Sequence, residues 1–361
     1  PAVSRFADNV RQLGLELQLH KSACYSLGLD LASHPARPPQ LPVGCFEVAD
    51  GTFVGRGISI AGVPVGDEAF VRAYLEHKSG QMLSKIETVV TKLRDQHLQS
   101  LYSVTLYCLR PMFQYWTQHC YPADCVPHAQ RVDQGVLAAV TMVLGNNLLD
   151  DDIAMQRLRL PARKFGGGIR SLADVAPAAF VGTLCKAAPL FADRRDGDWN
   201  LVPGFLPMLA VWFPADAFSS TSGDRPFARL LASESRLGQA LSVAWRHMQL
   251  EVGLDVSGPL RQAAASAGVG DDKLQRALTE QREQARFQRL DAAVRRLPAG
   301  DIRRTTWLSL DRFSTVWVSA WPSRDAYLSN PEFGEISSAY FALPSPCCAS
   351  LVGQPIGRSQ V

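Results

Sequence analysis

The sequence predicts a mainly α-helical protein with a small N-terminal α/β portion that contains a β-hairpin, followed by a helical bundle and a further helical extension. Apolar residues recur at three- and four-residue intervals through most of residues 67–306, which is the spacing of a helix face. β-Prone stretches lie at the front of the chain, in LGLELQL and among the glycines of residues 51–66. The hydrophobic content of 47% is typical of a globular protein, and the net charge of +3 is too small to require a nucleic-acid partner.

Residues 1–66 form the predicted α/β portion. Phe6, Val10 and Leu13 have the spacing of one stripe of a short helix, and the alternating sequence LGLELQL predicts a strand after it. The proline-rich stretch SHPARPPQLPVG is too interrupted for a helix, so we expect a connection there. The FV and ISIAGV pieces of residues 51–66 lie among glycines and predict a β-hairpin.

Residues 67–150 form the predicted helical bundle. Asp67 and Glu68 favour a helix N-terminus, because acidic side chains interact well with the positive end of the helix dipole. A helix over about residues 129–144 is expected to end at Gly145, a plausible C-cap. The expected breaks between helices are at Gly80, Pro111 and Pro127. The predicted core contains Phe70, Leu75, Leu83, Ile86, Val90, Leu101, Leu109, Leu137 and Val140.

Residues 151–306 form the predicted helical extension, and residues 307–361 form an aromatic and then proline-rich C-terminal segment. The acidic residues 150–152 begin a short helix that we expect to end near Pro161. The other expected segments are helices at about residues 174–191 and 271–297 and a proline-rich linker at residues 196–225.

Cysteine usage and hydropathy indicate the compartment. Eight cysteines are scattered along 361 residues and do not form a disulfide framework, so we expect reduced thiols and an intracellular protein, nuclear or cytoplasmic. The long uncharged runs are interrupted by proline and glycine, whereas a membrane span needs about 20 mostly apolar residues. We therefore expect no membrane partner.

Two clusters of potentially reactive residues leave alternatives open. The segment HCYPADCVPH could ligate zinc through His119, Cys120, Cys125 and His128, but its spacings favour a loop that joins helices. The acids of LLDDDI could hold metal ions as polymerase carboxylates do, but the helical pattern after them favours helix capping. GGGIRS lacks the GxxxxGK[ST] pattern of a phosphate-binding loop. The sequence therefore predicts no catalytic residue, no metal ligand and no cofactor in this chain.

Taken in order, several segments resemble a known family. LGLELQLHKS resembles the end of the palm of reverse transcriptases of non-LTR (LINE-type) retroelements, and GISIAGVPVGDEAFV resembles the hairpin that follows it. The stretch with TKLRDQHLQSLYSVTLYCLRP is similar to the thumb, and LRLPARKFGGGIRSLADVAPAAFVGTL to the segment after the thumb. TTWLSLDRFSTVWVSAWPS resembles a region further down. The order and spacing of these pieces matter more than any one of them.

The resemblance implies an RNA-directed DNA polymerase of which this chain is the C-terminal part. Residues 1–66 would be a palm remnant with the primer-supporting hairpin, and residues 67–150 the thumb. The chain would begin after the carboxylates that hold magnesium in the intact enzyme, so we expect it to be inactive alone. The fingers and palm portion that it lacks would be its protein partner. Its other partner would be an RNA–DNA or DNA template–primer duplex.

The resemblance also implies residues that contact nucleic acid. Lys21 would lie in the palm near the incoming nucleotide, although a strand-end lysine that faces solvent is an equal alternative. The primer-supporting turn would contain Gly62, Val63, Pro64 and Gly66, where glycine permits close approach of the backbone to a nucleic-acid strand.

A basic run provides further candidates for phosphate contacts. Between residues 157 and 170 there are five basic residues and no acidic residue, next to three glycines. These candidates are Arg157, Arg159, Arg163, Lys164 and Arg170. A second region, residues 273–304, has nine basic and four acidic residues. A solvated helix face or loop is an equally good interpretation of either region alone.

A function of another class is also compatible with the sequence. The chain could be a non-catalytic helical module for protein–protein interaction, or a decayed retroelement remnant without retained binding. Affinity for an RNA–DNA duplex that falls with salt would separate these functions, because phosphate contacts release counterions and an apolar protein interface does not.

Overall fold

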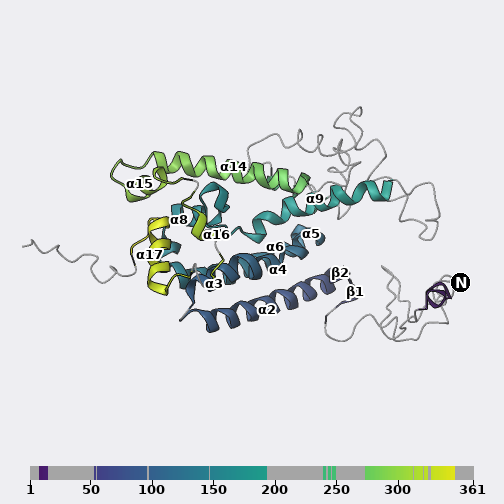
Figure 1. Ribbon diagram of the computed structural model, residues 1–361. Coiled ribbons are helices and arrows are strands. Elements are labelled where there is room, and N and C mark those ends of the chain that lie inside the picture. The colour runs from purple at the N-terminus through teal and green to yellow at the C-terminus, as the bar shows by residue number, and fades with distance from the viewer. Residues whose placement is uncertain are drawn as a thin grey trace, which may run out of the picture. The chain divides into compact units, whose positions relative to one another are not determined.

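In the computed structural model, the described part of the chain is mainly helical and contains a small two-stranded antiparallel sheet (Figure 1). The structure describes residues 8–14, 53, 55–95, 97–145, 147–192, 239–240, 243–244, 246–248, 273–311, 313–319, 321–323 and 327–345. The chain forms two compact units, Pro1–Gly80 and Gln81–Val361, and each is described by itself. The domain limits expected at residues 66, 150 and 306 stay predictions.

The first unit contains the predicted β-hairpin, which the structure confirms. Strand β1 (Gly57–Ile60) pairs with β2 (Val63–Gly66), and the register joins Ile60 to Val63 across a two-residue turn. Both turn residues, Ala61 and Gly62, have positive φ angles of 49° and 80°, as a type I′ hairpin turn requires. The Tyr74 hydroxyl donates to the Gly62 carbonyl at 3.2 Å and so fixes the turn.

Helix α2 (Glu68–Leu93) begins where the acidic pair predicts a helix N-terminus. The Asp67 carboxylate accepts hydrogen bonds from the backbone N–H groups of Phe70 at 2.8 Å and Arg56 at 2.7 Å, so it caps the helix and ties it to the hairpin. The helix continues through Gly80, and the expected break there is wrong. A glycine inside a helix costs only about 1 kcal/mol, which the helix-forming residues around it offset.

The second unit continues with a succession of short helices. Helix α3 (Leu98–Val104) passes into a π-helical segment η3 (Thr105–Leu109), then into α4 (Arg110–Met112) and α5 (Gln114–His119). Pro111 lies in the first turn of α4, where a missing N–H group is tolerated, and the buried Phe113 is the turn residue that separates α4 from α5. The observed break between helices therefore falls at Phe113, two residues after the predicted position at Pro111.

Helix α6 (Pro122–Leu144) is longer than predicted. It begins at Pro122 and contains Pro127, so the break expected at Pro127 is wrong. The proline removes one backbone hydrogen bond, but one face of the helix stays buried from Cys125 to Leu144 and holds it together. The helix ends as predicted, at Gly145 with a φ angle of 82°.

The remaining helices complete the second unit. Helix α9 (Leu172–Ala192) packs against α5, α6 and α14 (Lys273–Arg295), and α14 runs beside it in Figure 1. Toward the C-terminus of α14, the side chains of Leu160, Leu290, Val294 and Trp307 form an apolar cluster. The helices and their bounds are α7 (Asn147–Asp150), α8 (Asp152–Arg159), the 3₁₀ turn η4 (Ala162–Lys164), α9 (Leu172–Ala192), α14 (Lys273–Arg295), α15 (Ile302–Leu308), α16 (Val316–Ser319) and α17 (Asn330–Phe341).

Most of the predicted core side chains are buried. The fully buried ones are Phe70, Leu75, Ile86, Leu101, Leu109 and Val140. Leu83, Val90 and Leu137 are partly exposed instead. Leu83 lies against Gly135 of α6, where a Cβ atom would be 2.6 Å from the Leu83 Cδ2 atom, so the missing side chain of Gly135 lets Leu83 pack directly on the backbone of α6. Among the helices that the structure describes, none is long and apolar enough to cross a membrane.

Candidate functional site

The loop between α8 and α9 carries most of the predicted basic run, and its glycines pack tightly. A Cβ atom on Gly166 would lie 2.1 Å from the Leu160 carbonyl oxygen, and one on Gly167 would lie 2.9 Å from the Tyr102 hydroxyl. The Tyr102 hydroxyl donates to the Gly167 carbonyl at 2.6 Å. The glycines therefore allow the loop to lie against α3 and against its own first turn.

Arg157, the first residue of the run, lies in the interior with 3% of its surface exposed. Its guanidinium donates to the carbonyls of Phe165, at 3.0 Å, and Tyr340, and it stacks 3.8 Å from the centre of the Tyr340 ring. Burial lowers the pKa of this guanidinium. In this arrangement the side chain joins α8 to α17.

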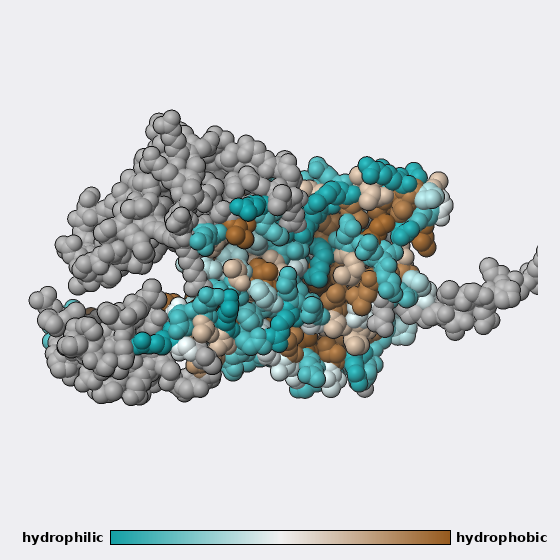
Figure 2. Space-filling model, turned by 180° about the vertical axis from the view of Figure 1, so that it is seen from behind, coloured by the Kyte–Doolittle hydropathy of each residue, from teal (hydrophilic) through white to brown (hydrophobic). Residues whose placement is uncertain are grey.

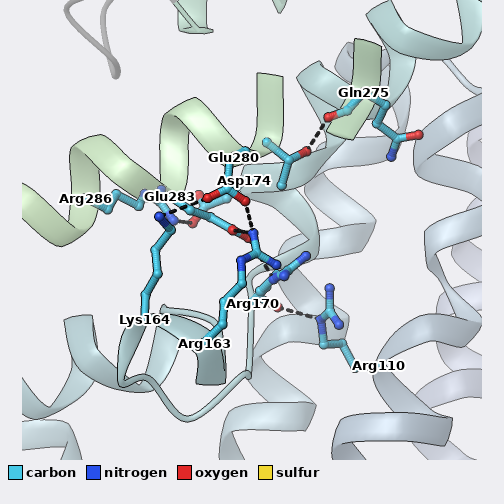
Figure 3. A network of polar contacts seen from close by, with 10 residues as sticks. Arg110, Arg163, Lys164, Arg170, Asp174, Gln275, Glu280, Glu283 and Arg286 are labelled. Carbon is cyan, nitrogen blue, oxygen red and sulfur yellow. Dashed lines mark hydrogen bonds and ion pairs between the residues drawn. The ribbon is translucent and has the colours of Figure 1, made fainter. Parts of the chain in front are cut away.

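Three other members of the run form ion pairs with helix α14, as Figure 3 shows. Arg163 pairs with both Glu280 and Glu283, while Lys164 Nζ lies 2.9 Å from Glu280 and Arg170 Nε lies 2.9 Å from Glu283. The Arg163 side chain is 52% exposed, which makes it the member most accessible to a partner.

The two acceptors on α14 differ in environment. The hydrogen bond from Lys164 lowers the pKa of Glu280, which lies near the surface. Burial raises the pKa of Glu283 above its ordinary value, although Arg170 and Arg163 oppose this effect. The network therefore contains one carboxylate at its rim and one in its interior.

A second set of pairs joins α9 to α14. Asp174 lies 2.9 Å from Arg286 and 3.6 Å from Arg282. Burial would raise the pKa of the Asp174 carboxyl, but Arg286 and Arg282 outweigh that effect and hold it below its ordinary value. Arg282 is 4% exposed, so this pair is largely shielded from solvent.

The N-terminus of α9 is capped from a different helix. Asp133 of α6 accepts hydrogen bonds from the Ser171 hydroxyl at 2.6 Å, from the Leu172 N–H at 2.8 Å and from the Ala173 N–H at 3.1 Å. Burial nevertheless raises the pKa of Asp133. The Asp133 carboxylate thereby positions the segment directly after Arg170, the last residue of the basic run.

Two further arginines complete the surroundings of the loop. Arg110 Nε donates to the Arg170 carbonyl at 3.0 Å, and Arg159 donates to the Ile169 carbonyl at 3.5 Å. Burial, with a contribution from Arg170, lowers the pKa of Arg110 to about 10. Several cations therefore lie close enough to repel one another.

The residues predicted at the primer-supporting turn lie in the first unit. Gly62 occupies the hairpin turn, Val63 and Pro64 begin β2, and Gly66 ends it where a Cβ atom would meet the Arg56 carbonyl oxygen at 2.4 Å. Lys21 lies outside the described residues. The structure thus brings the turn residues together in one hairpin, and it joins the basic run to α14 in the second unit.

The residues weighed as metal ligands have other environments. Cys120 and Cys125 are buried, and burial raises the pKa of Cys120 to about 12, which disfavours the thiolate. His119 is exposed and pairs with the Tyr115 carbonyl. Within the described residues, no three His, Cys, Asp or Glu side chains are placed to hold a metal ion.

The capping interpretation of LLDDDI is confirmed. Asp151 accepts hydrogen bonds from the N–H groups of Ile153 and Ala154, both at 2.9 Å, at the N-terminus of α8. Its other carboxylate oxygen lies 3.6 Å from Arg303.

Sequence reasoning did not identify the partners of the basic run. Arg282 and Arg286 fall in the second basic region, but their proximity to Asp174 follows from the packing of α14 on α9. The only sequence signal was the mixture of acids and bases at helical spacing on that segment. Comparisons with family models, with curated proteins and with solved structures found no match.

Proposed function

We propose that this chain is the C-terminal part of a reverse transcriptase of the non-LTR retroelement type, comprising the end of the palm, the thumb and the helical region after it. Its role would be to hold an RNA–DNA or DNA template–primer duplex by its backbone, with no chemistry of its own. The fingers and palm portion of the polymerase, which carries the magnesium ions in that family, would be its protein partner.

The hairpin of the first unit is the observation that carries this proposal. Its two-residue turn is held by a hydrogen bond from Tyr74 and its base by hydrogen bonds to Asp67, and a long helix follows at once. Ile60 and Val65, on its two strands, are 55% and 39% exposed. A hydrogen-bonded turn that contains glycine suits close contact with a nucleic-acid strand, and it has the place in the chain that the resemblance assigns to the primer support.

Binding to a fluorescent RNA–DNA duplex across a range of salt concentrations tests the proposal. We expect affinity that falls linearly with salt on logarithmic axes, because cations that neutralise phosphates release counterions. A variant with Arg163→Ala and Lys164→Ala should reduce the magnitude of the slope by about 1.8, at about 0.9 for each lost phosphate contact.

Arg289→Ala provides the matched control, since Arg289 is an exposed cation on α14 outside the ion-pair network. This control should leave the slope unchanged. Absence of duplex binding by the wild-type chain at low salt would refute the proposed function, and an unchanged slope in the folded double variant would remove the basic run from the interface.

Exposed apolar side chains favour a second candidate, a module for protein–protein interaction. Phe313, Val316 and Trp321 are 64%, 56% and 54% exposed, and Figure 2 shows apolar side chains at the surface of the described residues on the face drawn there. Binding through such a surface would depend weakly on salt. A salt titration therefore separates the two functions. Affinity for the duplex should fall steeply with salt, whereas affinity for a protein partner should change little.

A further inference from the structure

The cations that the proposed function assigns to a duplex have carboxylate partners within the chain. Three of the five members of the basic run, Arg163, Lys164 and Arg170, form ion pairs with Glu280 and Glu283 of α14. A duplex that binds through this loop therefore has to replace two carboxylates of the same chain.

Helix α14 presents these carboxylates on one face. Glu280 and Glu283 are three residues apart, a spacing that places two side chains next to each other on a helix. The sequence has no other acidic residue between positions 273 and 289, so the negative charge of this part of α14 is concentrated opposite the loop. Figure 3 shows Arg163 and Lys164 extending from the loop toward this face of α14.

Carboxylate and phosphate groups compete for the same donors. A guanidinium binds the oxygens of either group through one planar fork. In the free chain, the Nη2 atom of Arg163 lies against both Glu280 and Glu283, and the Nε atom of Arg170 lies 2.9 Å from Glu283. A backbone phosphate at this loop would use these same donors, so the phosphate and the α14 carboxylates exclude each other.

The two carboxylates differ in how easily they are displaced. The side chains of Arg163 and Glu280 are 52% and 44% exposed, and an exposed ion pair contributes little to stability. The side chain of Glu283 is 7% exposed, so its pairs with Arg163 and Arg170 are shielded from solvent and salt. A phosphate therefore displaces Glu280 more readily, whereas Glu283 retains the inner part of the basic run.

We propose that Glu280 and Glu283 form an autoinhibitory contact, which occupies Arg163, Lys164 and Arg170 until a nucleic-acid backbone displaces the two carboxylates. This inference rests on the proposed duplex binding and adds a regulation of the same site. By linkage, the contact weakens duplex binding as much as the duplex weakens the contact.

Duplex titrations with glutamine variants of the whole chain test this contact. Glutamine keeps the size of glutamate but removes its charge, so it leaves the cations to the phosphates. At one fixed low salt concentration, we expect Glu280→Gln to strengthen binding of the fluorescent RNA–DNA duplex about two- to fivefold. Glu280→Gln together with Glu283→Gln should strengthen it about tenfold or more. Urea unfolding of each variant checks that the chain is folded.

Two controls separate the contact from a general effect of charge. Asp150→Asn with Asp152→Asn makes the same change in net charge at two exposed carboxylates outside the ion pairs of the basic run, so it should change the affinity by less than about twofold. In a chain with Arg163→Ala and Lys164→Ala, Glu280→Gln should have no further effect, because both cations that Glu280 occupies are gone.

The possible outcomes separate this inference from the proposed function. Equal gains from the glutamate and aspartate variants, or a gain from Glu280→Gln that persists without Arg163 and Lys164, would overturn the autoinhibitory contact. If the wild-type chain binds the duplex and the glutamate changes leave its affinity unchanged, the contact fails and the proposed function stands. If neither the wild-type chain nor the double glutamine variant binds the duplex at low salt, both fail.

Discussion

At the scale of single residues, the same type of side chain has unlike roles within a few positions. Arg157 is enclosed by aromatic rings and carbonyls, whereas Arg163, six residues later, is half exposed and pairs with two carboxylates. Both belong to one acid-free run in the sequence, where nothing distinguishes them. The difference arises because α17, far along the chain, covers one of them and leaves the other at the surface.

Replacement of Arg157 by lysine should destabilise the fold. Lysine keeps the charge but cannot form the planar fork that donates to Phe165 and Tyr340, so a buried carbonyl loses its partner. We expect a loss of about 1–3 kcal/mol in the free energy of unfolding, measured with urea. Arg163→Lys, at an exposed ion pair, should change it by less than about 1 kcal/mol. Equal effects of the two changes would contradict the role assigned to Arg157.

Asp174 should contribute to the pH dependence of stability. Its pKa is lowered in the folded chain, so its contribution is present above the ordinary value of 3.8 and is lost as the pH falls toward the folded value. The stability difference between wild type and Asp174→Asn, measured by urea unfolding, should therefore be largest near neutral pH and shrink below about pH 4. A difference that is constant between pH 7 and pH 3 would argue against the ion pairs with Arg286 and Arg282.

At the scale of elements, the sequence predicted where helices and strands exist better than where they end. The hairpin at residues 57–66, the start of α2 after its cap Asp67 and the end of α6 at Gly145 follow from local signals, namely glycines, an acidic cap and a C-cap. Gly80 and Pro127 carry equally clear local signals, yet both lie inside helices. Burial along a helix is a property of the packed chain, and it outweighs a single unfavourable residue.

Gly80→Ala should stabilise the protein. A Cβ atom at this position meets nothing within 4 Å, and the residue lies inside α2. Alanine loses less conformational freedom on folding, so we expect a gain of about 0.4–1 kcal/mol, measured by chemical denaturation. Gly166→Ala should act in the opposite direction, because its Cβ atom would lie 2.1 Å from the Leu160 carbonyl oxygen.

At the scale of the whole molecule, the chain forms two compact units, Pro1–Gly80 and Gln81–Val361, while the limits expected at residues 66, 150 and 306 stay predictions. Packing at this scale also changes the interpretation of the candidate site, because it pairs the basic run with carboxylates of α14. The sequence identified the cations of the basic run, but it could not show that Glu280 and Glu283, more than a hundred residues away, lie against them. Long-range pairing of this kind depends on how α14 packs, and no local pattern encodes it.

The purified chain should not extend a primer in the presence of magnesium and nucleotides. The acidic pair most similar to a polymerase motif includes Asp151, which caps α8 through Ile153 and Ala154 and lies near Arg303. Extension of a primed RNA template in a gel assay is the measurement. Template-dependent synthesis that is abolished by Asp150→Ala and Asp151→Ala would contradict both this expectation and the capping role.

Helix α14 is attached by different forces along its length. Toward its N-terminus the attachments are mainly charges, from Glu280 to Arg286, and toward its C-terminus they are the apolar side chains of Leu290 and Val294. Salt screens the exposed pair of Arg163 with Glu280, acts much less on the buried Glu283 and Arg282, and strengthens the apolar contacts or leaves them intact. We therefore expect added salt to weaken only the exposed rim of this attachment, while the buried pairs and the apolar side chains keep α14 in place.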